Sequence, residues 1–391
     1  MSSLIYKWSL SLLLCCVLLT VARAQVSRQG SLSTPAQFVE EGNKYAGERQ
    51  YDQAVDAYRQ AIKLDPTLAA AYHGLGKVYV DMGRASDALG PMRTAIRLDP
   101  ENAIAHVNLG ITLENLRRFD EALTELNEAK RLNPQNATIH NELGNLLNNF
   151  LARPSDALAA YQEARRLDPN DSRVQHNLGL TLMMLGKFAA AIAPLQEALR
   201  LDPQYRNARY LLSDAYGKLG RYDEAIESWS KFLEIVPNGP EALTKRTWNY
   251  LYVGGHDREA AADARQYLDV HGWHTQSSTF MVIIAHLGYR GSGMDQEALA
   301  ILDEGAAKVN NTAWPYVIVR YLKGDATAEE VLRQATDNDK RTEGHAYIGL
   351  ALRLKGERDE ARTHFEWVKE YGNKRYYEYP LAIEELKRLE R

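Results

Sequence analysis

Apolar residues recur at helical spacing in two neighbouring stretches near the middle of the chain. In the first stretch, Leu178 and Leu182 lie four residues apart, and in the second, Ile192, Leu195 and Leu199 follow the same spacing. A Leu-Gly-Lys sequence interrupts the pattern between the two stretches. Residues three or four positions apart lie on one face of a helix, so the pattern predicts two short amphipathic helices joined by a tight turn.

This helix pair is repeated along the chain, and a proline marks the end of each copy. The prolines are Pro66, Pro100, Pro134, Pro169, Pro203 and Pro237, at intervals of 34, 34, 35, 34 and 34 residues. Proline cannot continue the helical hydrogen-bond ladder, so it stops the second helix of each pair. A fixed period of this length is typical of stacked-repeat proteins, in which each unit buries its apolar face against its neighbours.

Small residues hold the same positions in successive copies. Gly179 on the first helix is matched by Gly76, Gly110 and Gly144, and Ala191 on the second by Ala88, Ala122, Ala157 and Ala225. Only a small side chain lets two antiparallel helices approach closely, so these columns predict tight packing within each pair.

The combined pattern resembles the tetratricopeptide repeat. The first copy carries the pattern as Phe38, Gly42, Tyr45, Ala54, Tyr58, Ala61 and Pro66. The resemblance implies an all-α fold, an α-α superhelix (right-handed TPR solenoid). It also implies that the first helices line a concave groove for an extended peptide or a partner helix.

The strength of the pattern divides the chain into segments. We predict a signal peptide at 1–24, a flexible lead-in at 25–34, six well-formed repeats at 35–237, degenerate helix pairs at 238–336, a further repeat at 337–375 and a C-terminal capping helix at 376–391. The last helix combines an apolar side with many charges, as the end of a solenoid must, because its outer face meets water.

The first 24 residues have the pattern of a secretory signal peptide. Lys7 precedes an apolar run, and Ala22-Arg23-Ala24 forms a small-residue cleavage site, so we expect a cut after Ala24. The run is shorter than the roughly 20 apolar residues of a spanning helix, so we expect no membrane span in the mature chain. This predicts a periplasmic or secreted protein. Both a bacterial envelope and a eukaryotic secretory route stay open, because three Asn-x-Ser/Thr sequons are present.

Composition and motifs argue against catalysis and nucleic-acid binding. Charged residues make up 25% of the chain with a net charge of −4, whereas nucleic-acid-binding domains are usually basic. The only cysteines, Cys15 and Cys16, fall in the predicted leader, and no phosphate-binding loop or nucleophile elbow is present. His271 and His274 lack a third ligand nearby in sequence, so we expect no metal site. We therefore predict a non-enzymatic protein without cofactors.

The candidate binding residues lie on the expected groove face of the first helices. Four asparagines in the fourth copy share one helix face although asparagine is a poor helix former, and methionines follow in the fifth. The amides could bind a ligand backbone and the methionines its side chains, or the amides could bond to one another along the groove. The predicted partner-binding residues are Asn115, Asn141, Asn145, Asn148, Asn149, His176, Asn177, Met183, Met184 and Tyr210.

The chain from Trp314 onward has a second resemblance. The order Trp314, Tyr-Leu-x-Gly, Glu-Val-Leu, Gly356-Glu357 and Glu378-Tyr379 is similar to the C-terminal part of bacterial envelope tetratricopeptide lipoproteins that act as adaptors of cell-wall hydrolases. The resemblance implies a protein–protein interaction adaptor or scaffold of the cell envelope. The alternative is a component of a polysaccharide-export or outer-membrane assembly complex.

Overall fold

The computed structural model describes residues 34–275 and 277–390. Within these ranges the chain forms 21 α-helices and no strand, which confirms the predicted all-α class. The helices belong to two compact units, Met1–Leu167 (unit 1) and Asp168–Arg391 (unit 2). The predicted signal peptide and residues 25–33 of the lead-in lie outside the described residues.

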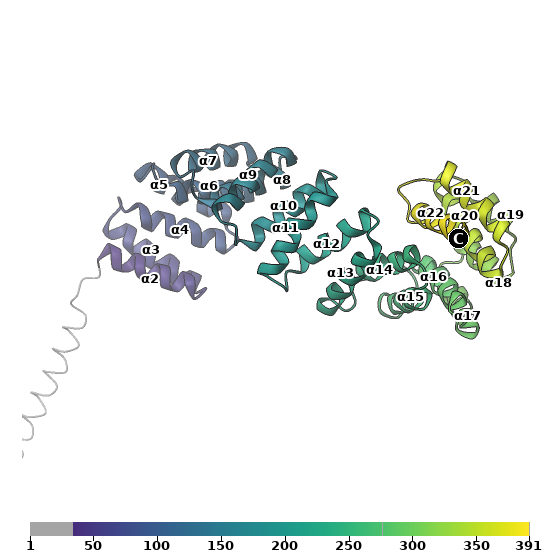
Figure 1. Ribbon diagram of the computed structural model, residues 1–391. Helices are drawn as coiled ribbons and strands as arrows, with labels where there is room; N and C mark the ends of the chain where they lie inside the picture. Colours follow the sequence, from purple (N-terminus) through teal and green to yellow (C-terminus); the bar gives the residue numbers. More distant parts are fainter. Residues whose placement is uncertain (1–33, 276, 391) are drawn as a thin grey trace, which may run out of the picture. The chain divides into compact units, whose positions relative to one another are not determined.

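Unit 1 consists of four helix pairs that follow one another along the chain (Figure 1). They are α2 (Pro35–Gly47) with α3 (Tyr51–Leu64), α4 (Ala69–Asp81) with α5 (Ala85–Leu98), α6 (Ala103–Asn115) with α7 (Phe119–Leu132), and α8 (Ala137–Asn149) with α9 (Pro154–Leu167). The turn between α8 and α9 is one residue longer than the turn between α6 and α7, so the extra residue of the fourth copy lies in a turn.

Each pair of unit 1 closes on a glycine of its first helix. A Cβ atom added at Gly144 would lie 2.5 Å from the ring of Tyr161, and one at Gly110 would lie 2.9 Å from Leu126. No real side chain fits at such distances, so the aromatic or aliphatic residue of the second helix fills the space that glycine leaves. The predicted close approach of the two helices is therefore present.

The turns between the paired helices need a left-handed residue. Gly83 has φ 74° and Arg117, at the same place in the next copy, has φ 59°. Glycine adopts this conformation without steric cost, whereas arginine does not. The repeat thus tolerates a strained residue where helix packing on both sides fixes the turn.

Unit 2 begins with regular pairs and becomes irregular toward its end. Its helices are α10 (Ser172–Met184), α11 (Phe188–Leu201), α12 (Arg206–Lys218), α13 (Tyr222–Ile235), α14 (Pro240–Val253), α15 (Asp257–His271), α16 (Ser278–Gly291), α17 (Asp295–Lys308), α18 (Tyr316–Lys323), α19 (Ala328–Gln334), α20 (Asn338–Lys355), α21 (Arg358–Tyr371) and α22 (Glu378–Glu390). The shortest are α18 and α19, in the segment where the sequence pattern is weakest.

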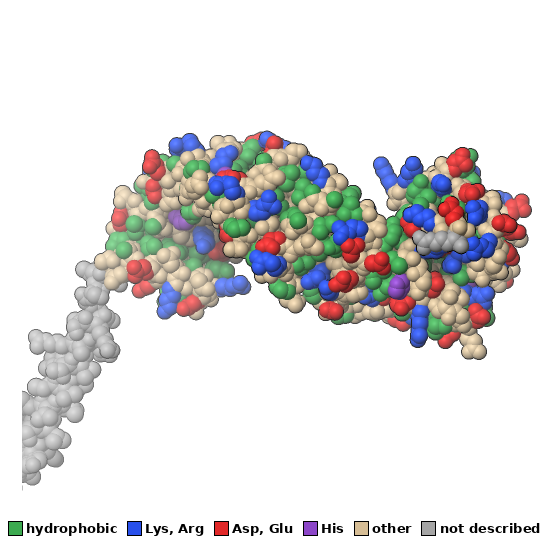
Figure 2. Space-filling model, viewed as in Figure 1, with side chains coloured by type: hydrophobic (Ala, Val, Ile, Leu, Met, Phe, Trp, Pro, Cys, Tyr) green, Lys and Arg blue, Asp and Glu red, His purple; other side chains and the backbone are tan. Residues whose placement is uncertain are grey.

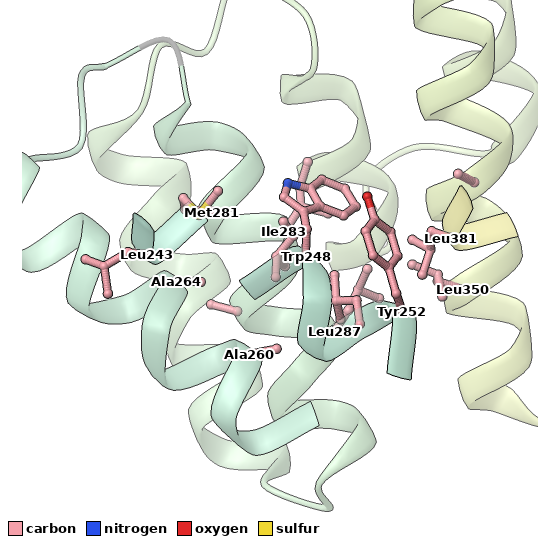
Figure 3. Close-up of a cluster of buried hydrophobic side chains, with 14 of the residues drawn as sticks. Leu243, Trp248, Tyr252, Ala260, Ala264, Met281, Ile283, Leu287, Leu350 and Leu381 are labelled. Atoms are coloured by element: carbon pink, nitrogen blue, oxygen red, sulfur yellow. The ribbon is translucent and has the colours of Figure 1, made fainter. Parts of the chain in front are cut away.

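The apolar core of unit 2 runs continuously from the regular pairs to the last helix. Figure 3 shows part of this core, where side chains of α14 meet those of α16 and, at the far side, Leu350 and Leu381. Leu350 belongs to α20 and Leu381 to α22. The last helix is therefore packed into the same core as α14, more than a hundred residues earlier.

Charged groups reinforce this contact between α22 and α14. The carboxylate of Glu385, 1% exposed, lies 2.8 Å from Arg353 Nε and also pairs with Arg388. Arg388 in turn donates hydrogen bonds to the carbonyl oxygens of Leu251 and Tyr252 at the end of α14. A cation at a helix C-terminus satisfies carbonyls that have no partner within the helix. Of the described helices, none is both long and apolar enough to cross a membrane.

Candidate partner-binding surfaces

The predicted binding residues divide between the two units, and each unit is described by itself. In unit 1, the face of the first helices that carries them is called the first-helix face. Here α8 places Asn141 and Asn148 in buried positions, 6% and 4% exposed, Asn145 in a half-buried one, and Asn149 in an exposed one. The four amides therefore lie in different environments although they share one helix.

Asn145 connects three side chains of unit 1. Its Oδ1 accepts a hydrogen bond from Tyr161 of α9 at 2.8 Å, and its Nδ2 donates to Glu142 at 3.1 Å. Asn141 Nδ2 donates to the other oxygen of the Glu142 carboxylate at 3.2 Å. Glu142, which the sequence analysis did not single out, thus holds two of the predicted amides in place.

The first copy repeats the contact between tyrosine and asparagine. Tyr58 of α3 donates a hydrogen bond to Asn43 Oδ1 at 2.7 Å, and burial raises the pKa of Tyr58 to about 12. In the copy where the second helix carries Met92 instead of tyrosine, the residue after the glycine is Lys77 rather than asparagine. The signal was therefore present in the sequence: the asparagine occurs where a tyrosine hydroxyl needs an acceptor.

The remaining polar groups of the first-helix face are more accessible. Asn115 on α6 and Asn149 on α8 are exposed at equivalent places of adjacent repeats, and Asn149 Oδ1 accepts a hydrogen bond from Asn148 at 3.3 Å. Next to Asn115, burial raises the pKa of Glu114 to about 7, and the nearby Glu142 carboxylate adds to this effect. The face therefore offers amide and carboxyl groups.

A polar cavity of about 420 Å³ adjoins α2 and α4 in unit 1. Its lining includes Asn43, His73, Lys77 and Asp81. Asn108 of the next repeat donates a hydrogen bond to His73 Nε2 at 2.6 Å, while burial and the Lys77 charge lower the pKa of His73. His73 is thus held as a neutral acceptor.

The predicted residues of unit 2 take part in contacts between its helices. The His176 ring stacks on Tyr205 with centroids 4.9 Å apart, its Nδ1 lies 3.1 Å from Asn177 Oδ1, and burial lowers its pKa. Met183 packs against the core, whereas Met184 is exposed. Tyr210 donates a hydrogen bond to Glu241 and packs edge-on against Trp229.

The buried histidines of the repeats have a structural role. His106 and His140 each direct Nε2 at a carbonyl oxygen six residues earlier, that of Pro100 at 3.2 Å and that of Pro134 at 2.8 Å. In the next copy Gln175 makes the equivalent bond to Pro169. These bonds attach the start of each first helix to the preceding proline turn, and the described residues contain no group of three potential metal ligands.

Charges are dispersed over the face of the molecule that Figure 2 shows. Figure 2 shows acidic and basic side chains interspersed on the visible face, often next to each other. Many belong to pairs within one helix, such as Arg131 with Glu128 at 2.6 Å. Such mixed charge is typical of a solvated surface.

Consecutive helix pairs closed on small residues, with polar side chains along the first helices, define a tetratricopeptide-repeat protein, a class that typically serves as a non-catalytic interaction scaffold. The profile of the family described as the Cilia and flagella-associated protein 70 C-terminal domain matches residues 18–245. The match spans more than half of the 391 residues, and the chain belongs to this family. The predicted repeat identity is therefore confirmed.

Among curated proteins, the chain is similar to a tetratricopeptide repeat and J domain-containing co-chaperone of Cryptococcus neoformans. The two are 38% identical over 73 residues, which cover 19% of this chain. The chain spans only 14% of the length of this relative.

Solved structures with a similar fold include PilF of Pseudomonas aeruginosa, which has a TM-score of 0.46 and 25% identity, with 59% of this chain and 96% of that chain covered. PilW, a type IV pilus biogenesis factor, has a TM-score of 0.47 and 21% identity, and the match covers 55% of this chain and 98% of that chain. YrrB, a tetratricopeptide-repeat protein with an unusual peptide-binding site, has a TM-score of 0.43 and 24% identity, and the match covers 49% of this chain and 97% of that chain.

Proposed function

We propose that this chain is a non-enzymatic adaptor or scaffold of the cell envelope, and that the first-helix face of unit 1 binds an extended peptide or a helix of a partner protein. The observation that carries the proposal is the preorganised row of polar groups on this face. Tyr58 donates a hydrogen bond to Asn43, and Tyr161 donates one to Asn145. Glu142 accepts a hydrogen bond from Asn141. Fixed polar groups lose little conformational entropy when a ligand binds them.

The chemistry of the face favours a peptide backbone as ligand. Amides such as that of Asn149 offer both a donor and an acceptor, so they can bond to any peptide regardless of its sequence. A single hydrogen bond contributes roughly 0.5–1.5 kcal/mol net, so several repeats must contribute to reach micromolar affinity. An extended ligand along α4, α6 and α8 meets this requirement.

The envelope location rests on the N-terminal sequence. Lys7, the apolar run and the Ala22-Arg23-Ala24 site carry the signal for export. Expression of the whole chain followed by mass spectrometry of its N-terminus tests this part of the proposal. A mature protein that begins at Gln25 and lies outside the cytoplasm is the expected result, whereas an intact Met1 terminus in the cytoplasm would contradict it.

The interaction itself is tested by affinity purification of the mature protein with quantitative mass spectrometry. The double variant N115A/N149A removes two exposed amides of the first-helix face and is expected to lose the proteins that the unmodified chain captures. The matched control is N127A, because Asn127 is an exposed asparagine on α7, a second helix.

The comparison between these variants decides the outcome. Loss of the same partners with N115A/N149A, together with full capture by N127A and unchanged thermal unfolding of both, agrees with the proposal. Equal capture by all three proteins would rule out this face as the binding surface.

A further inference from the structure

A second candidate site lies in unit 2 and is formed by residues of that unit alone. It is a pocket of about 370 Å³ between α12, α14 and the segment 374–380 that precedes and begins α22. The volume falls within the range of small-ligand and side-chain pockets. The pocket exists because the C-terminal segment returns to α14, so its wall combines residues more than a hundred positions apart.

Hydrogen bonds and ring stacking fix the C-terminal wall of the pocket. Tyr252 donates a hydrogen bond to the Tyr377 carbonyl oxygen at 2.9 Å, and the Tyr377 ring stacks on Trp248 with centroids 5.2 Å apart and planes 11° apart. Tyr376 donates to Asp339 at 2.9 Å. Figure 3 shows Trp248 and Tyr252 adjacent on α14, the helix that receives this segment. Tyr376 and Tyr377 are therefore held at the pocket, directly after Lys374 and Arg375 in the chain.

The pocket is basic although the whole chain carries a net charge of −4. Its lining holds four basic residues against one acidic residue: Lys218, Lys245, Lys374 and Arg375 against Asp214. Lys245 pairs with Asp214 at 2.5 Å and also approaches Glu241 at 3.5 Å. The other three basic side chains are exposed, and within the described residues they form no ion pair.

Two polar groups inside the pocket lack partners. Asn249 is 5% exposed and Trp248 is 3% exposed, and both line the pocket. Within the described residues, neither the Asn249 amide nor the Trp248 indole N–H makes a hydrogen bond. A methyl group added at Gly217 of the pocket wall would lie 3.7 Å from Asn249 Oδ1. Both side chains line the pocket, so their polar groups are available to a ligand that enters it.

We propose that this pocket binds an extended acidic segment of a partner protein, with an aspartate or glutamate carboxylate at Lys374 and Arg375 and the adjoining backbone on Asn249 and Trp248. Arginine and lysine form charge-assisted hydrogen bonds with a carboxylate. The Asn249 amide can accept from a peptide N–H and donate to a peptide carbonyl, and the indole N–H donates to a carbonyl. The Tyr377 ring, 45% exposed, gives the apolar part of the segment a flat surface.

A peptide fits this pocket better than a nucleic acid. The pocket has room for a few side chains, and the net negative charge of the chain would repel a long polyanion. The two cations that receive the carboxylate come from the segment before α22 and not from the repeated helices, so repeat periodicity does not predict them. The proposal rests on unit 2 alone, and it shares with the proposed function only the idea that the chain binds proteins.

The test is selection from a random dodecapeptide phage library on the purified mature chain, followed by titration of the selected synthetic peptide. We expect enrichment of peptides that contain Asp or Glu. The K374E/R375E variant should lose this enrichment and bind the selected peptide at least about tenfold more weakly, because attraction becomes repulsion. The matched control is K187E/R206E, which reverses two exposed basic residues of unit 2 outside the pocket.

A second variant examines the interior of the pocket. N249A should weaken the same peptide about tenfold without changing thermal unfolding, because the Asn249 side chain holds no other described group in place. Replacing the acidic residues of the peptide by Asn or Gln should abolish binding to the unmodified chain. Peptides selected without acidic residues, equal binding by K374E/R375E, or complete competition by equimolar inorganic phosphate would each overturn the proposal.

The two proposals fail separately. N115A/N149A lies in unit 1 and should bind the selected acidic peptide as tightly as the unmodified chain does. Loss of partner capture by that variant with retained peptide binding would establish two sites, whereas loss of peptide binding by that variant would contradict the assignment of the acidic segment to unit 2.

Discussion

Units 1 and 2 are built from the same repeat but are held together in different ways. In unit 1, side-chain contacts between copies reach one repeat along the chain, as from Asn108 to His73. In unit 2, Arg388 bonds to carbonyls of α14 that lie 136 and 137 residues earlier. A regular array needs only contacts between neighbours, whereas the irregular end of unit 2 gains stability by folding its last helix back onto an earlier one.

The comparison also separates two uses of polar residues. In unit 1 the buried and half-buried amides bond to neighbouring side chains, as the half-buried Asn145 does to Tyr161 and Glu142. In unit 2, buried charges hold distant helices together, and Asn249 is left without a partner among the described residues. The polar side chains buried in unit 1 therefore fix the groups of a surface. Those buried in unit 2 hold distant helices together next to a pocket.

The largest loss of stability is expected when the ion pairs that hold α22 against the rest of unit 2 are removed. E385A leaves Arg353 and Arg388 partly buried without their carboxylate and should lower the free energy of unfolding by about 3–5 kcal/mol. Urea denaturation measures the loss, and amide hydrogen exchange should locate it in α14, α20 and α22. The control E384A removes an exposed pair with Lys387 and should cost no more than about 1 kcal/mol. Equal losses of unfolding free energy in E385A and E384A would contradict the inference that Glu385 holds α22 against the rest of unit 2.

The next effect depends on pH and concerns two carboxyl groups of unit 2. Burial raises the pKa of Glu343 to about 8, with Glu378 adding to the shift, and burial raises the pKa of Glu378 to about 7. Both carboxyls keep their protons in the folded state at pH values where the unfolded chain, with carboxyl pKa values near 4.5, has lost them. The contribution of these two groups to the free energy of unfolding should therefore be greatest below pH 4.5 and fall as the pH rises toward 8.

E343Q tests this pH dependence. Glutamine can still accept the hydrogen bond from Trp314 but does not titrate, so the variant should lose less stability than the unmodified chain between pH 5.5 and pH 8. Urea denaturation at both pH values gives the difference. E366Q changes an exposed residue of α21 and serves as the control. Identical pH profiles for the unmodified chain and E343Q would refute the assignment.

A smaller effect is expected from the packing within a pair of unit 1. G144L places a side chain where Tyr161 lies 2.5 Å from the new Cβ, and it should destabilise the protein by about 1–3 kcal/mol. G90L is the matched control, because Gly90 is a helical glycine with open space around its Cβ position. Thermal unfolding of the two variants gives the comparison, and a neutral G144L would show that the pair can open without cost.

The smallest effect concerns a turn of unit 1. R117G replaces an arginine at φ 59° by the residue that adopts this conformation freely, and it should stabilise the protein by about 0.5–1 kcal/mol. G83A, at the same place in the preceding copy, should have the opposite sign and a similar size. Urea midpoints measure both, and a destabilised R117G would mean that the contact of Arg117 with Phe119 outweighs the backbone strain.

The sequence by itself determined the paired helices, their period and the glycines on which they close. These features are local: the spacing of Leu178 and Leu182 defines a helix face, and the spacing of the prolines defines where each pair ends. It also located the face that carries Asn115 and Asn149, because equivalent positions of a repeat share an orientation.

Only the tertiary structure decided how the polar residues are used and where unit 2 closes. Asn141 and Asn148 are buried although Asn149 on the same helix is exposed, and the bond of Asn145 depends on Tyr161 across the pair. The return of α22 to α14 joins helices that are not neighbours in the chain, and repeat spacing does not say which distant copies meet. Contacts of that kind are selected by the free energy of the whole packed unit, which no short stretch of sequence contains.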